Sequence, residues 1–304
     1  MRWRTACISI VVAIWVSSGP YSSYAQLAAS QPLSELQSDA PCSVSAADDE
    51  ESDRPEISIA EVTFSGTLQM PVSEQSHIAE SIKRKTHGTS LQEVTDEALE
   101  RARAGWQDRG YFKVQLVGET KTLTSSPASQ RMALSVRILD EGALYNLAGI
   151  TFEHNKAISN VKLLRDFFPI KDGDLFERDK IGTGIDNLRS AYGELGYINF
   201  TTVPNTKVDD TRNLISLKMD LDEGKRFHVR SINILGLDED IKQELLRSTP
   251  IKPGQIYNGR LWESFILKSA PLIPECTCGS VPQFQADDKS GAVVLTLDFR
   301  PCPQ

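Results

Sequence analysis

One eight-residue motif occurs twice in this chain, as PIKDGDLF at residues 169–176 and as PIKPGQIY at residues 250–257. A proline, a glycine four residues later and a final pair of apolar or aromatic residues indicate a helix end, a turn and an anchor for the next helix. A looser copy, THGTSL, occupies residues 86–91. The two close copies are 81 residues apart, and such a period predicts a module repeated in tandem.

The segments on either side of each motif copy also repeat. Before it come short runs with apolar residues two apart, as in a half-buried strand, at residues 61–66, 149–152 and 231–236. Each run is followed by a helix-like segment. After the motif, the first two copies carry apolar residues at i, i+3 and i+7, which is one face of a helix. These residues are Leu99, Ala102 and Trp106 in the first copy, and Ile185, Leu188 and Tyr192 in the second.

Each of these helices ends in Gly-Tyr, at residues 110–111 and 196–197, and two alternating strands close the unit. The last strands of the first two copies end in Asp-Glu-Gly, at residues 140–142 and 222–224. Counted from that glycine, the apolar positions differ by one residue, which predicts a β-bulge in one copy. Neighbouring carboxylates at a strand end do not converge on one substrate atom, so we interpret both Asp-Glu pairs as solvated turn residues.

The predicted fold class is therefore α+β, in tandem β-α-α-β-β units that each have a three-stranded sheet with two helices on one face. We place the units at residues 56–142, 143–225 and 226–304. The third unit diverges, because the helix that begins near residue 261 lacks the Gly-Tyr ending and runs into PLIPECTCG at residues 271–279.

These features together resemble the polypeptide-transport-associated (POTRA) domain. The resemblance rests on the apolar-x-Phe-x-Gly first strand, the proline–glycine motif, the Gly-Tyr helix end and the Asp-Glu-Gly junction that runs on to Tyr145 and Phe227. It covers about residues 57–300. POTRA domains occur in tandem in outer-membrane assembly factors and two-partner secretion transporters, where they precede a β-barrel. No barrel-like series of strands follows residue 300, so we expect a separate barrel protein as partner.

The resemblance implies that an extended client peptide pairs with an open sheet edge, by β-augmentation. In the family's strand order the second strand of each unit lies at that edge. The expected peptide-binding residues are Phe112, Lys113, Val114, Gln115 and Leu116 in the first unit and Ile198, Asn199, Phe200 and Thr201 in the second. The alternative is a merely solvated edge, protected by Lys113 or by the neighbouring unit.

The start of the chain reads as an export signal. Residues 1–25 combine a basic start, an apolar run of about a dozen residues and the ending Ser-Tyr-Ala, which predicts a cleaved signal peptide rather than a membrane anchor. Residues 26–55 are polar and acidic, and we interpret them as a flexible tether. The net charge of −8, without basic clusters, argues against nucleic acid as a partner. No later segment is apolar enough to span a bilayer as a helix.

Cysteine and histidine give no metal or catalytic signature. Export favours a disulfide among Cys276, Cys278 and Cys302, over a zinc site that lacks a fourth nearby ligand. Cys42 has no assigned role. The four histidines are scattered, and we expect surface or capping roles for them. We also find no nucleotide-binding or nucleophile motif, so we predict no cofactor, no metal and no enzymatic activity.

The function that follows is a non-catalytic periplasmic docking module, associated with the outer membrane, that assists outer-membrane protein assembly or the secretion of exported polypeptides. Two alternatives stay open. A structural envelope adaptor of the division-protein type would keep its N-terminal anchor. An envelope hydrolase would need convergent polar residues in one cleft, and the repeat pattern offers no such cluster.

Overall fold

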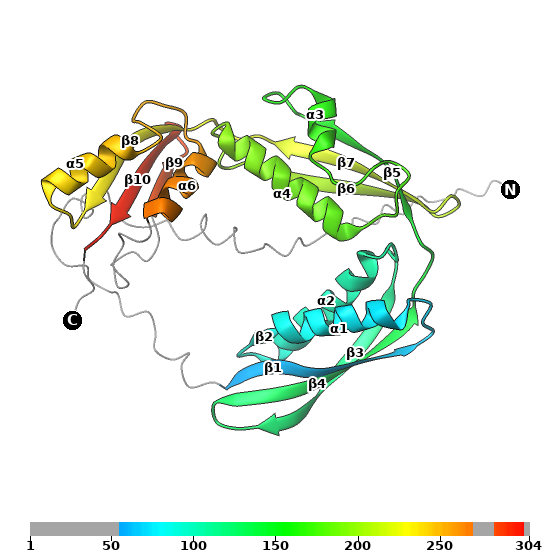
Figure 1. The fold of residues 1–304 in the computed structure, drawn as a ribbon. Coiled ribbons are helices and arrows are strands. Elements are labelled where there is room, and N and C mark those ends of the chain that lie inside the picture. Colours follow the sequence, from blue (N-terminus) through cyan, green and yellow to red (C-terminus); the bar gives the residue numbers. More distant parts are fainter. Residues whose placement is uncertain (1–54, 270–282, 301–304) are drawn as a thin grey trace.

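The computed structural model describes residues 55–269 and 283–300. These residues form three successive units, each with a sheet covered on one face by helices (Figure 1). The predicted fold class, tandem β-α-α-β-β units, is confirmed. The proposed signal peptide, nearly all of the tether and all of the cysteines lie outside the described residues.

The first unit has the longest strands. Its elements are β1 (Glu56–Gly66), α1 (Val72–Lys85), β2 (His87–Gly88), α2 (Leu91–Gln107), β3 (Gln115–Ser125) and β4 (Ser129–Asp140). The sheet order is β2-β1-β4-β3, with β1 and β4 parallel and the other pairs antiparallel. The short strand β2 is one more than the three predicted. It forms because the loose motif copy lies alongside Ile57 and Ser58 and pairs with them.

The second and third units have the predicted three-stranded sheets. The second contains β5 (Asn146–Glu153), α3 (Val161–Asp166), α4 (Arg178–Glu194), β6 (Thr201–Asp209) and β7 (Leu214–Asp222), in the sheet order β5-β7-β6. The third contains β8 (His228–Leu235), α5 (Glu239–Ser248), α6 (Gly259–Ser269), β9 (Gln283–Asp287) and β10 (Ala292–Asp298), in the order β8-β10-β9. In both units the repeated motif meets the first strand through a single bridge, Asn146 with Leu175 and His228 with Ile256.

Each unit has its own apolar core between helices and sheet. The helical faces expected from the sequence supply its largest side chains, since Trp106 and Tyr192 are both fully buried. Tyr192 also stacks on Phe200, with ring centroids 4.1 Å apart. Close helix packing depends on Gly105, where an added Cβ would lie 2.7 Å from the Ile78 side chain. In the first unit these contacts pack α1 and α2 against each other and against the sheet.

The predicted bulge lies in the first unit. Gln115 pairs with Asp140 but the next residue, Leu116, pairs with Ile138, so Leu139 is the extra residue on β4. Its side chain is 48 % exposed, as expected of a residue displaced from the ladder. The equivalent pairing of β6 with β7 runs without a shift. The bulge therefore explains why the apolar positions of the two copies differ by one.

The interpretation of both Asp-Glu pairs as solvated turn residues is wrong for Glu141, and Glu223 is half-buried. Glu141 is only 2 % exposed. Its carboxylate accepts hydrogen bonds from the backbone N–H of Gln69 (2.6 Å) and Met70 (3.3 Å) and from the indole of Trp106 (3.0 Å). In the second unit Glu223 accepts from the Ala157 N–H (2.9 Å) and the Tyr192 hydroxyl (3.0 Å). Each glutamate thus ties the loop after the first strand to the aromatic residue of the second helix, Glu141 as a buried acceptor and Glu223 as a half-buried one.

Candidate functional site

The sheet edges at β3, β6 and β9 are open in the described residues, and those of β3 and β6 are the two on which the sequence predicts that a strand adds. β3 lies at one end of the first sheet, and β6 lies at one end of the second. Each pairs on one side only, with β4 and β7 respectively. An edge strand presents unpaired backbone N–H and C=O groups along its free side.

The edge of β3 is long, with one irregularity at Leu123, where the pairing with β4 shifts by one residue. Its eleven residues contain no proline, so every residue carries a backbone donor. From Val117 onward none of its residues is buried. On the helix side, the Thr120 hydroxyl lies 3.0 Å from the Thr95 hydroxyl of α2, and Gly118 packs beneath Leu99. These contacts hold the strand in place while its far edge stays uncovered in the described part of the chain.

The edge of β6 differs because Pro204 lies in its middle. A proline within an edge strand is normally oriented so that its missing N–H faces solvent, which removes one donor from the free edge. The preceding residue, Val203, is 70 % exposed. Of the two edges, β3 therefore offers the more complete row of hydrogen-bonding groups.

Most of the residues predicted for peptide binding lie just before these strands. In the first unit Phe112, Lys113 and Val114 precede β3, and only Gln115 and Leu116 belong to it. Phe112 is buried and contacts Phe176 of the second unit edge to face, at a centroid distance of 5.4 Å.

The second unit repeats this arrangement. Ile198, Asn199 and Phe200 precede β6, and Thr201 is its first residue. Ile198 packs against the core of the third unit, and the Asn199 amide donates to Asp288 of the third unit at 2.6 Å. Phe112, Ile198 and Asn199 thus join one unit to the next, and Lys113 does so through an ion pair with Asp210 of the second unit.

The joint between the first two units is built around the Gly-Tyr helix end. Gly110 has φ +84°, the left-handed conformation expected at a helix C-terminus. Its carbonyl accepts a hydrogen bond from the Tyr145 N–H at 3.1 Å. The Leu175 side chain packs where a Cβ on Gly110 would be. In the second joint Gly196, Phe227 and Ile256 take the same three roles, with a hydrogen bond of 2.9 Å. The repeated motif therefore supplies the contact between units.

Polar contacts between the first two units also involve the β6–β7 hairpin. Asp210 in that hairpin forms an ion pair with Lys113, and it accepts a hydrogen bond from the Tyr145 hydroxyl at 2.7 Å. Both hydrogen bonds lower the pKa of the exposed Asp210 carboxyl, the Lys113 bond most. This contact could not be predicted from the sequence, because it depends on the orientation of the second unit relative to the first.

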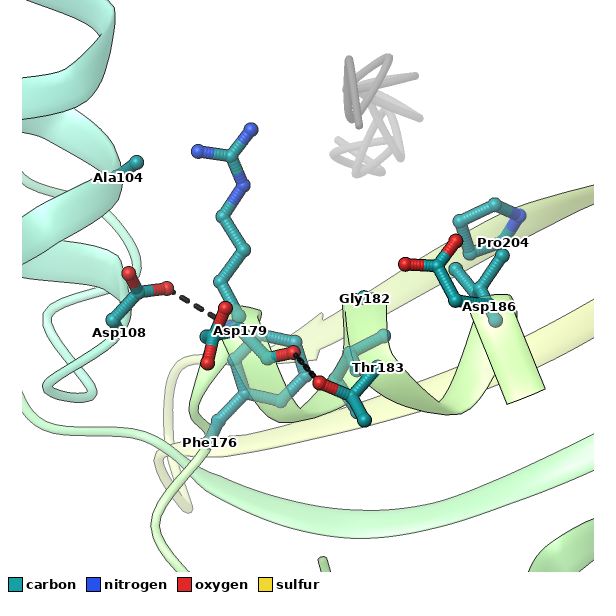
Figure 2. Close-up of a pocket in the computed structure, with 11 residues that line it drawn as sticks. Ala104, Asp108, Phe176, Asp179, Gly182, Thr183, Asp186 and Pro204 are labelled. Carbon is teal, nitrogen blue, oxygen red and sulfur yellow. Dashed lines mark hydrogen bonds between the residues drawn. The ribbon is translucent and has the colours of Figure 1, made fainter. Parts of the chain in front are cut away.

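On the other side of the joint, α2 meets the start of α4 (Figure 2). Asp108, at the C-terminal end of α2, accepts a hydrogen bond from the Asp179 N–H at 2.9 Å, and Arg178 pairs with Glu100 at 3.3 Å. Burial, with a further contribution from the Asp179 carboxylate, raises the pKa of Asp108 to about 6. A cleft of about 180 Å³ lies beside these residues and is also lined by Asp186 and Pro204.

We searched residues 55–269 and 283–300 for a metal site and for a membrane-spanning helix. No group of three or more His, Cys, Asp or Glu side chains there is placed to hold a metal ion. His154 pairs with the exposed Asp220 at 2.6 Å. In the same residues, no helix is both long and apolar enough to cross a bilayer.

Comparison with known proteins agrees with this fold. Residues 145–224 match the POTRA family model, described as a surface antigen variable number repeat. The crystal structure of POTRA domains 3–5 of Haemophilus influenzae BamA covers 80 % of this chain and 96 % of its own, with a TM-score of 0.57 and 18 % identity. The second unit is therefore a POTRA domain, and the three units share the fold of tandem POTRA domains.

Curated relatives share moderate identity. The chain is 25 % identical over 224 residues to outer membrane protein assembly factor BamA of Neisseria meningitidis serogroup B, which is 67 % of this chain and 26 % of that protein. It is 26 % identical over 168 residues to a Treponema pallidum protein named as a candidate outer membrane protein assembly factor, 54 % of this chain and 20 % of that protein. The chain thus spans between a fifth and about a quarter of these relatives' length.

Proposed function

We propose that this protein is a non-catalytic periplasmic docking module that assists outer-membrane protein assembly or polypeptide secretion. It holds an extended segment of a client or partner against the free edge of β3, by β-augmentation. It acts beside an outer-membrane barrel protein. The names of the relatives, outer membrane protein assembly factors, support the process.

The observation that carries the proposal is the free edge of β3. Eleven residues without proline lie at one end of the sheet, and the two-residue strand β2 lies at the opposite end, where it pairs with Ile57 and Ser58. Main-chain hydrogen bonds along such an edge bind an extended peptide with little regard to its sequence, while side-chain contacts add preference. A module that receives many different clients needs this combination. The polar outer residues Glu119 and Lys121 keep the edge soluble when it is empty.

Site-specific photocrosslinking in the native envelope tests the proposal. A photoreactive amino acid is placed at Val117 or Lys121 on β3 and, as a control, at Arg189 on the exposed side of α4. We expect outer-membrane protein precursors or a barrel protein to be captured from β3 and not from α4. Capture of only inner-membrane or cell-wall proteins would instead favour the structural adaptor.

A pair of proline substitutions distinguishes the edge from the rest of β3. Successive backbone N–H groups of a strand point to opposite edges. Of the two variants Glu119→Pro and Thr120→Pro, one therefore removes a donor at the free edge and the other removes a donor in the ladder to β4. The free-edge variant is expected to keep its fold and lose most crosslinking. The ladder variant is expected to lose about 3 kcal/mol of stability in the first unit. Circular dichroism identifies which variant is folded, and unchanged crosslinking in that variant would refute augmentation at β3.

The matched substitution in the second unit is expected to increase crosslinking, because it adds a backbone donor to the edge strand. Pro204→Thr restores a backbone donor on β6 without adding a large side chain. We expect crosslinking from a probe at Val203 to increase several-fold, because the edge then presents a complete row of donors. No increase, in a protein of unchanged stability, would mean that the missing donor does not limit strand addition to β6.

A further inference from the structure

The two joints of the chain carry different charges at equivalent positions. The residue two before the joint glycine is Asp108 in the first joint and Glu194 in the second. The facing residue, at the same place relative to the repeated motif, is Asp179 in the first and Arg260 in the second. Glu194 and Arg260 form an ion pair at 2.9 Å. At these equivalent positions the second joint thus brings together opposite charges, whereas the first brings together two carboxylates. The ion pairs of the first joint, Lys113–Asp210 and Arg178–Glu100, lie at other positions.

The capping of the helix that follows each joint also differs. In the second joint Asn258 precedes α6, and its side chain accepts a hydrogen bond from the Leu261 N–H at 3.0 Å. The N-cap of α6 therefore comes from its own unit. In the first joint Glu177 precedes α4 and makes no such bond. The acceptor comes instead from the first unit, through the 2.9 Å bond between Asp108 and the Asp179 N–H. One unit therefore caps a helix of the next, and separating the units would break this bond.

The charged groups around Asp108 come from three helices. From α4, Arg178 and Asp179 face it, and Asp186 lines the same cleft. Arg109, the next residue of the chain, is engaged by Glu74 of α1 at 2.7 Å. Arg178 is engaged by Glu100 of α2. Both neighbouring arginines thus have other carboxylates as partners, which limits how far they offset the repulsion between Asp108 and Asp179.

We propose that the joint between the first and second units is an acid-tightened hinge, closed when Asp108 is protonated and loosened when it ionises against Asp179, whereas the joint between the second and third units is held by opposite charges. This inference concerns how the units are set relative to one another and does not depend on what β3 binds.

The direction follows from the pKa of Asp108. It rises from 3.8 to about 6 in the closed joint, mainly through burial. A group whose pKa is raised in the closed state favours that state at low pH, and the advantage is lost as the pH rises toward the raised pKa. If separation returned the carboxyl to 3.8, the equilibrium constant for opening would rise about tenfold between pH 5 and pH 8.

Single-molecule energy transfer on the full chain measures this opening. Fluorophores are attached through genetically encoded reactive amino acids at the exposed residues Glu80 and Arg189, which lie on α1 and α4. A second pair at Arg189 and Arg247 reports on the second joint. We expect the open population of the first joint to rise about tenfold from pH 5 to pH 8 and that of the second to stay constant. Equal responses of the two joints, or no response in either, would overturn the proposal.

Two substitutions separate this mechanism from a general effect of acid. Asp108→Asn keeps a side-chain acceptor for the Asp179 N–H but carries no charge, so the joint should stay closed from pH 5 to pH 8. Asp179→Arg copies the second joint and should also hold the first joint closed at pH 8. The control Glu194→Gln should not give the second joint a pH response. A pH response that persisted in Asp108→Asn would assign it to another group and refute the role of Asp108.

Discussion

Replacing Glu141 with alanine is expected to destabilise the first unit by about 3–5 kcal/mol. The carboxylate is the shared acceptor for the Gln69 and Met70 N–H groups and the Trp106 indole. Without it all three donors lose their partner, and two of them, on Met70 and Trp106, belong to buried residues, for which an unpaired donor costs about 1–3 kcal/mol each. The loop between β1 and α1 also loses its attachment to α2.

Urea unfolding followed by tryptophan fluorescence measures this loss. Trp106 lies in the first unit and Trp262 in the third. In protein that lacks residues 1–25, which contain Trp3 and Trp15, a Trp262→Phe background therefore isolates the first unit's transition. The neighbouring Asp140→Ala, at an exposed position, is the control and should cost less than about 1 kcal/mol. Glu141→Gln, which keeps one acceptor oxygen, should fall between the two. Equal midpoints for Glu141→Ala and Asp140→Ala would show that the three bonds contribute nothing net.

Local periodicity was enough to predict the units themselves. Apolar residues at i, i+3 and i+7 identified the faces of α2 and α4 that bury Trp106 and Tyr192. The mismatch in apolar positions before the Asp-Glu-Gly sequences predicted a bulge, which the structure locates at Leu139. These features succeed because they are set by the 3.6-residue and two-residue periods of the backbone.

The burial of Glu141 could not be predicted in this way. Its backbone donors belong to a loop 71 and 72 residues earlier in the chain. A glutamate next to Asp and Gly at a strand end has the composition of an exposed turn, and only the packing of β1 beside β4 brings the loop to it. The available signal was a Trp or Tyr 35 or 31 residues before each Glu, because buried Trp and Tyr need a hydrogen-bond partner.

The strands that form these edges, β3 and β6, begin a few residues later than predicted, for the same reason. Residues 112–114 alternate apolar and polar side chains like a strand, but Phe112 is buried against Phe176 of the next unit. A sequence pattern shows that a side chain is buried and does not show which unit buries it. The residues between the Gly-Tyr end and β3 therefore belong to the joint, and the free edge begins beyond them.

Gly110→Ala is expected to destabilise the first unit and its joint by about 2–4 kcal/mol. The φ of +84° costs an L-residue about 1–2 kcal/mol, and the new Cβ would lie 2.5 Å from a methyl carbon of Leu175. Gly173→Ala is a matched control, because its φ is +92° but nothing lies within 4 Å of the added Cβ. The difference between the two variants isolates the contact between the units from the backbone strain.

The clash between an alanine at position 110 and the Leu175 side chain should also be relieved by shortening Leu175. Leu175→Ala in the Gly110→Ala background removes the opposing methyl groups, so the double variant should be destabilised by less than the sum of the two single variants. Hydrogen exchange of the Tyr145 N–H, which donates to the Gly110 carbonyl, reports on the joint itself and should accelerate in Gly110→Ala but not in Gly173→Ala. Strict additivity of the two substitutions would mean that Leu175 does not press on Gly110, and that the motif which repeats along the chain orders each unit without joining it to its neighbour.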